Sequence, residues 1–112
     1  MRVLRQYTVF YLTATGHAPT QEFLGKLNRG MADTLRKGRE QVHIMAYAGP
    51  TYNDPQMLAD KMDGENVVLA LVEKGEGDAF TCYPFAEHIA EIRRVLKTSE
   101  GTSYDVLRRM IE

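Results

Sequence analysis

The chain has 112 residues, 44% of them hydrophobic, and its 14 Lys and Arg nearly balance its 15 Asp and Glu. This composition is that of one folded domain and excludes an intrinsically disordered chain. A single cysteine, Cys82, excludes an intrachain disulfide and a zinc site built from several cysteines.

The first half of the chain predicts a strand, a helix and a second strand. A β-branched and aromatic run over residues 5–14 is apolar enough to lie inside a sheet. After a turn at 16–20, apolar residues recur at helical spacing as far as Leu35. Residues 41–48 then alternate as in a strand, and a helix through 31–48 is the alternative.

The second half of the chain predicts a helix, a β-hairpin and two further helices. A capping side chain and a proline suited to the first helical turn stand together at 53–55. The apolar run 66–72 passes through a glycine-rich turn into 79–83, which indicates a hairpin. A helical face follows after Pro84, and a last helix begins with a shortened capping box within 102–111.

The order β-α-β-α-β-β-α over residues 5–97 resembles the thioredoxin-like fold. The stretch 15–20 falls where that family has its C-x-x-C motif, between the first strand and the first helix. Residues 53–59 resemble the family's short second helix, and 67–80 its closing hairpin. The resemblance implies a single α/β domain over 1–112, with a thioredoxin-like sheet, flanking helices and an added C-terminal helix.

The sequence differs from that family at the positions that carry the family's redox chemistry. His17 and Thr20 stand where the two redox cysteines would be, and neither can supply the thiolate that attacks a disulfide. Glu65 and Asn66 occupy the place of the family's cis-proline. The resemblance therefore implies a redox-inactive member. Such members, the clock-associated KaiB family among them, are protein-binding modules, so we expect no enzymatic activity, no catalytic residues, no cofactor and no metal.

Charge is unevenly distributed along the chain. Residues 1–44 carry seven basic and three acidic side chains, residues 45–92 two and nine, and residues 93–112 five and three. Segregated charge orients association with a protein partner, although solvated helix faces would produce the same pattern. We expect a regulatory module that binds a protein through the 15–20 loop and the acidic block, with candidate partner-binding residues Gly16, His17, Pro19, Thr20, Asp54, Asp60 and Asp63.

Other residues with reactive or ligating side chains have structural interpretations. Cys82 alternates with Phe80 and is typical of a buried apolar position. His43 and His88 are too far apart in sequence to indicate a metal-binding pair. The turn at 75–77 lacks the lysine and hydroxyl residue of a phosphate loop, so it indicates a hairpin only.

The sequence also indicates the compartment. No basic segment followed by an apolar run opens the sequence, and no stretch approaches the roughly 18 apolar residues of a membrane span. We therefore expect a cytoplasmic protein without a membrane partner. Its balanced charge is a poor match to nucleic-acid phosphates.

Two alternative functions belong to other classes. If 31–48 were helical, the order would resemble RelE-type ribonuclease toxins, with 18–24 as the start of their first helix. The late strands at 67–72 and 80–83 contain no Arg or Lys, so such an RNA-acting protein would be inactive. The other alternative is a self-associating structural protein, a homodimer formed through the first strand if that strand lies at a sheet edge, or through the apolar face Val106, Leu107, Met110 and Ile111.

Overall fold

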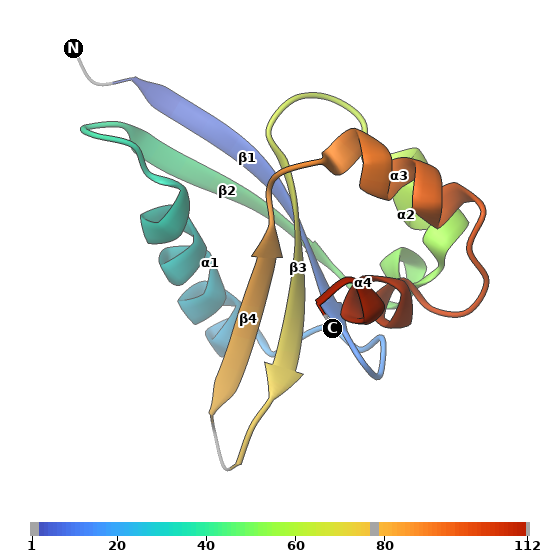
Figure 1. The fold of residues 1–112 in the computed structure, drawn as a ribbon. Coiled ribbons are helices and arrows are strands. Elements are labelled where there is room, and N and C mark those ends of the chain that lie inside the picture. The colour runs from blue at the N-terminus through green and yellow to red at the C-terminus, as the bar shows by residue number, and fades with distance from the viewer. Residues whose placement is uncertain (1–2, 77–78, 112) are drawn as a thin grey trace.

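The computed structural model describes residues 3–76 and 79–111 and has a four-stranded mixed sheet with helices on both faces (Figure 1). The strands are β1 (Leu4–Thr13), β2 (Gln41–Ala48), β3 (Val67–Lys74) and β4 (Phe80–Phe85). The helices are α1 (Gln21–Leu35), the 3-10 helix η1 (Pro50–Asn53), α2 (Pro55–Lys61), α3 (Ile89–Lys97) and α4 (Ser103–Ile111). Among the described residues, no helix is long and apolar enough to cross a membrane.

The sheet has the order β2-β1-β3-β4, with β1 at an internal position. β1 pairs in parallel with β2 on one side and with β3 on the other, and β4 runs antiparallel to β3. Parallel neighbours need crossover connections, so α1 covers one face of the sheet and α2 the other. This is the 2-1-3 order of doubly wound sheets, with β4 added as an antiparallel edge.

The strand predicted at 41–48 is confirmed with the same bounds. Alternate residues of β2, among them Val42 and Ile44, pack toward α1, whereas the residues between them are exposed. The helical alternative for 31–48 is wrong, because α1 ends at Leu35. The arrangement on which the resemblance to ribonuclease toxins depended is therefore not the observed one.

The core lies in two layers separated by the sheet. Six consecutive residues of β3, from Val67 to Val72, are buried, as expected for a strand covered on both faces. The layer beneath α1 contains Tyr7, Val9, Tyr11, Met31, Val68, Ala70 and Val72. The layer beneath the other helices contains Phe10, Leu12, Leu58, Leu69, Leu71, Leu96 and Leu107.

Side-chain caps begin three of the helices. Thr20, Asp54 and Thr102 each accept a hydrogen bond from a backbone N–H two or three residues later. Asn53, which precedes the cap of α2, instead accepts a hydrogen bond from the backbone N–H of Tyr104 at 3.1 Å. Asn53 thereby joins the segment after β2 to the beginning of α4.

The first strand lies inside the sheet, as its apolar run predicted, so the condition for self-association through it, a position at an edge, is not met. One sequence-based expectation about the sheet needs correction. The strand predicted at 79–83 continues through Pro84 to Phe85, because β4 is an edge strand, where a proline is tolerated. Part of the predicted glycine-rich turn, residues 77–78, lies outside the described residues.

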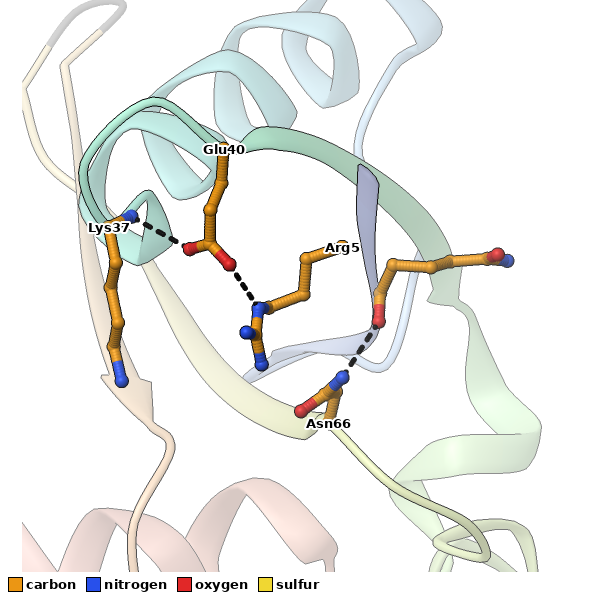
Figure 2. A network of polar contacts seen from close by, with 5 residues as sticks. Arg5, Lys37, Glu40 and Asn66 are labelled. Carbon is orange, nitrogen blue, oxygen red and sulfur yellow. Dashed lines mark hydrogen bonds and ion pairs between the residues drawn. The ribbon is translucent and has the colours of Figure 1, made fainter. Parts of the chain in front are cut away.

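Polar side chains tie the amino ends of β1, β2 and β3 together (Figure 2). Arg5 Nε donates to Glu40 Oε2 at 2.6 Å, and the other oxygen of Glu40 accepts from the backbone N–H of Lys37 at 3.1 Å. On the opposite side of β1, Asn66 Nδ2 donates to the carbonyl of Gln6 at 3.3 Å. The hydrogen bond from Arg5 lowers the pKa of the Glu40 carboxyl.

We predict that Arg5→Ala raises the pKa of Glu40 toward its ordinary value. A carboxyl whose pKa is lowered on folding adds stability above its unfolded pKa, about 4.3, and this stability is lost as the pH falls through the folded pKa. The variant should therefore lose less stability on acidification than the unmodified chain does. An NMR titration of the carboxyl carbons measures the shift, and Arg36→Ala, which breaks the exposed pair with Asp33, is the control that should leave Glu40 unchanged.

A matched pair of glycines tests the backbone conformations. Neither Gly30, inside α1, nor Gly38, at φ +62°, has an atom within 4 Å of the position a Cβ would take. We predict that Gly30→Ala raises the free energy of unfolding by about 0.5–1 kcal/mol through helix propensity. Gly38→Ala should lower it by about 1 kcal/mol, because the left-handed region disfavours a Cβ. Urea denaturation measures the free energy of unfolding of both variants. Effects of the same sign would contradict the helical conformation of Gly30 or the left-handed conformation of Gly38.

Candidate functional site

The strand order reverses at β1, and this position defines the candidate site. The chain passes from β1 outward through α1 to β2, then returns across β1 through α2 to β3. In open parallel sheets, ligands bind in the crevice outside the carboxyl ends of the strands at such a reversal. Here the carboxyl ends of β1 and β3 lie on the same side as the beginning of α1 (Figure 1).

A cavity of about 510 Å³ lies at this point of the sheet. Its walls come from the end of β1 and the loop after it, from the end of β3, and from the first residues of β4 and α4. The lining side chains that bear on function are His17, Pro19, Glu73, Lys74, Phe80 and Tyr104. The segment predicted at 15–20 to carry the site therefore does line a cavity.

Two further cavities continue this one along α1. One of about 420 Å³ is lined by Pro19, Phe23, Lys26, Lys74 and Phe80, and one of about 300 Å³ lies between α1 and β4. Phe80 lines all three cavities, its ring contacts that of Phe23, and the residue is 38% exposed. We call these three adjoining cavities together the Phe80 groove, defined by His17, Pro19, Phe23, Lys26, Gly30, Lys74 and Phe80.

The loop that forms one wall of the groove is tightly folded. Gly16 is buried at φ +77°, and a Cβ there would lie 3.1 Å from Asn53 Nδ2, so only glycine fits without strain. The backbone N–H of Gly16 donates to the carbonyl of Thr13, whose own hydroxyl donates to the carbonyl of His17 at 2.8 Å. These contacts hold the exposed His17 at the rim of the cavity.

Glu73 is neutralised at the other wall. Its Oε1 accepts a hydrogen bond from the Tyr104 hydroxyl at 2.9 Å and lies 2.7 Å from Arg108 Nε. Burial, followed by the hydrogen bond to Glu73, raises the pKa of the Tyr104 hydroxyl. Lys26 and Lys74 form no ion pair with any acidic side chain of residues 3–76 and 79–111. Glu22 lines the same cavity as both lysines, so this part of the groove carries two positive charges and one negative charge beside its two phenylalanine rings.

The structure brings together only some of the residues predicted to bind a partner. His17, Pro19 and Thr20 line the groove, although the Thr20 hydroxyl also caps α1, whereas Gly16 is buried in the loop behind it. The Asp54 carboxylate caps α2. The structure therefore assigns a folding role to the side chain of Asp54.

Asp60 and Asp63 lie apart from the groove. Both are exposed at the end of α2 that leads toward the amino end of β3, whereas the 15–20 loop follows the carboxyl end of β1. The acidic block therefore forms no continuous surface with that loop.

Sequence reasoning missed the aromatic part of the groove. Phe23 and Phe80 are typical of core positions, and nothing in the sequence shows that β4 places Phe80 beside α1. The one available signal was that Phe80 directly follows a turn, where the first strand residue is commonly solvent-accessible. The basic residues Lys26 and Lys74 gave no signal beyond their charge.

The chemistry of the described side chains gives little reactivity. Cys82 faces α1 from β4, and burial raises the pKa of its thiol, which makes it a poor nucleophile. No group of three His, Cys, Asp or Glu side chains suited to a metal ion occurs within 3–76 and 79–111. No known protein family matches the chain, and no curated protein or solved structure shows significant similarity to it.

We predict that Glu73→Gln lowers the pKa of Tyr104 part of the way back to its ordinary value. The substitution removes the charge that disfavours the tyrosinate, while the burial that raises the pKa most remains. NMR of the tyrosine ring carbons as a function of pH measures the shift. Asp105→Asn, a more exposed acidic neighbour, is the control and should move the pKa less; an equal shift would contradict the assigned role of Glu73.

Proposed function

We propose that the chain is a non-enzymatic module that binds a segment of a protein partner in the Phe80 groove. The observation that carries the proposal is one exposed aromatic side chain, Phe80, common to three adjoining cavities. Aromatic residues at the centre of a contact surface supply much of the affinity of protein interfaces. A groove bounded by a helix and a strand fits an extended or helical peptide better than a compact ligand.

The lining of the groove defines the chemistry of the partner segment. Phe23 and Phe80 offer an apolar surface to an aliphatic or aromatic side chain. Lys26 and Lys74 outnumber the one acidic residue of the same cavity, Glu22, so the net positive charge there would attract a carboxylate of the partner. The partner segment therefore carries an apolar anchor next to Asp or Glu.

The proposal includes the absence of redox catalysis. His17 and Thr20 stand where a thioredoxin-like enzyme carries its thiols, and Cys82 lies in β4 with its thiol pKa raised. The relation to thioredoxin-like domains stays a proposal and rests on element order and on the position of the 15–20 loop between β1 and α1. The parallel pairing of β3 with β1 adds support for recognition at the carboxyl ends of the strands, because ligands bind there in doubly wound sheets.

A displayed library of random peptides, selected on the intact chain, tests this function. We predict that enriched peptides share an apolar or aromatic residue next to an acidic one. Phe80→Ala should weaken their binding at least about tenfold, because it removes the apolar anchor site, a loss of about 1.4 kcal/mol. Gly30→Leu should weaken it similarly by filling the groove, since Gly30 has open space around it. Calorimetry or fluorescence polarisation measures the affinities.

The matched control for these variants is Met57→Ala. Met57 is a large exposed apolar side chain on α2, on the opposite face of the sheet, and its removal should leave peptide binding unchanged. Enriched peptides that bind Phe80→Ala as tightly as the unmodified chain, or that carry basic residues in place of acidic ones, would overturn the proposal.

A further inference from the structure

The two edges of the sheet differ in how they are protected. β4 is six residues long and contains Pro84, which has no N–H to offer to another strand. β2 is eight residues long and contains no proline and no Lys, Arg, Asp or Glu. Natural edge strands are normally protected by charges, prolines or short length, and β2 has none of these.

The backbone of β2 presents a regular row of unused hydrogen-bonding groups. The N–H of Gln41 donates to the carbonyl of Val3 at 2.9 Å, so Gln41 and every second residue after it face β1. The N–H and C=O groups of the intervening residues, Val42, Ile44, Ala46 and Ala48, therefore point away from the sheet. No other segment among the described residues bonds to them.

The side chains of β2 that face away from α1 form an open surface beside this edge. Met45 and Tyr47 are each 37% exposed and lie opposite Thr8 and Phe10 of β1. The amino-terminal ends of β1 and β2 extend beyond the helices that cover this face (Figure 1), and Leu4, which shares a face of β1 with Thr8 and Phe10, is 64% exposed.

We propose that β2 pairs with β2 of a second copy of this chain, antiparallel and about a twofold axis, to form one continuous sheet. In a twofold interface the residues of β2 lie opposite residues of the same strand in the second copy, so the side chains of β2 must be able to pack against one another. β2 meets this condition because it brings no like charges together, and like charges directly opposite one another destabilise a pair of strands. The occupant that fits this edge is therefore a second copy.

The free backbone groups determine the register of this pairing. The backbone N–H and C=O groups of all four outward-facing residues find partners in only one register. In this register Ile44 lies opposite Ala46 of the second copy, and Val42 lies opposite its Ala48. Each of these pairs sets a large side chain against a small one on the α1 face. Met45 then lies on the twofold axis opposite Met45 of the second copy, in a non-hydrogen-bonded pair with Cα atoms about 4.5 Å apart.

Dimerisation at this edge is independent of partner binding in the Phe80 groove. β2 and β4 are at opposite edges of the sheet, and the groove is formed by α1, β4 and the carboxyl ends of β1 and β3. Pairing through β2 therefore leaves the groove accessible in both copies.

Opposite charges at position 45 test the proposal. The unmodified chain should sediment as a dimer, and Met45→Lys and Met45→Glu should each raise the dimer dissociation constant at least about tenfold, because like charges then meet on the axis. An equimolar mixture of the two variants should regain the dimer. The matched controls are Met57→Lys and Met57→Glu, which change a methionine on α2 that is somewhat more exposed than Met45, and these variants should remain dimeric. Circular dichroism verifies that every variant is folded.

Cross-linking tests the register separately. In a Cys82→Ala background, Met45→Cys should form an intermolecular disulfide on mild oxidation, because opposite residues of a non-hydrogen-bonded pair are within reach of one. A dimer that fails to cross-link would overturn the register. A monomeric unmodified chain, Met45 variants that stay dimeric, or a mixture that stays monomeric would overturn pairing through β2.

Discussion

The pairing of β1 with parallel strands along both of its edges is the constraint on which the rest of the structure depends. Parallel neighbours cannot be joined by tight turns, so the chain has to cross the sheet twice, once on each face. The two crossings bury β3 on both sides and divide the core into two layers. They also bring the carboxyl ends of β1, β2 and β3 to one end of the molecule, and so decide where a depression forms.

The local elements were largely predictable because their signals are local. Alternation predicted β2, helical spacing predicted α1, and caps or a proline marked the beginnings of α2 and α4. The orientation of β3 relative to β1 was not predictable, because an apolar run such as Val67–Val72 suits either direction. The length of β4 was misjudged at Pro84 for a related reason: whether a proline ends a strand depends on the strand's place in the sheet.

The candidate site was predictable only where a loop follows a strand. His17 lines the cavity because the glycine-containing turn predicted between β1 and α1 is present there, with Gly16 at positive φ. Phe80 was missed because its exposure depends on α1, which is distant in sequence. Asp60 and Asp63 were predicted to share a binding surface with that turn only because their part of the sequence is acidic. Charge summed along a sequence carries no information about which end of a helix a residue lies near.

Pro84 has a consequence for the size of any assembly built by extending the sheet. A sheet with two receptive edges can add a neighbour on each side, and repetition of that contact gives open-ended fibres. Here the β4 edge lacks a donor at Pro84, while the β2 edge is complete. One receptive edge per copy is saturated by a single neighbour. An assembly extended through β2 alone would therefore stop at two copies, because Pro84 leaves the β4 edge without a complete row of donors.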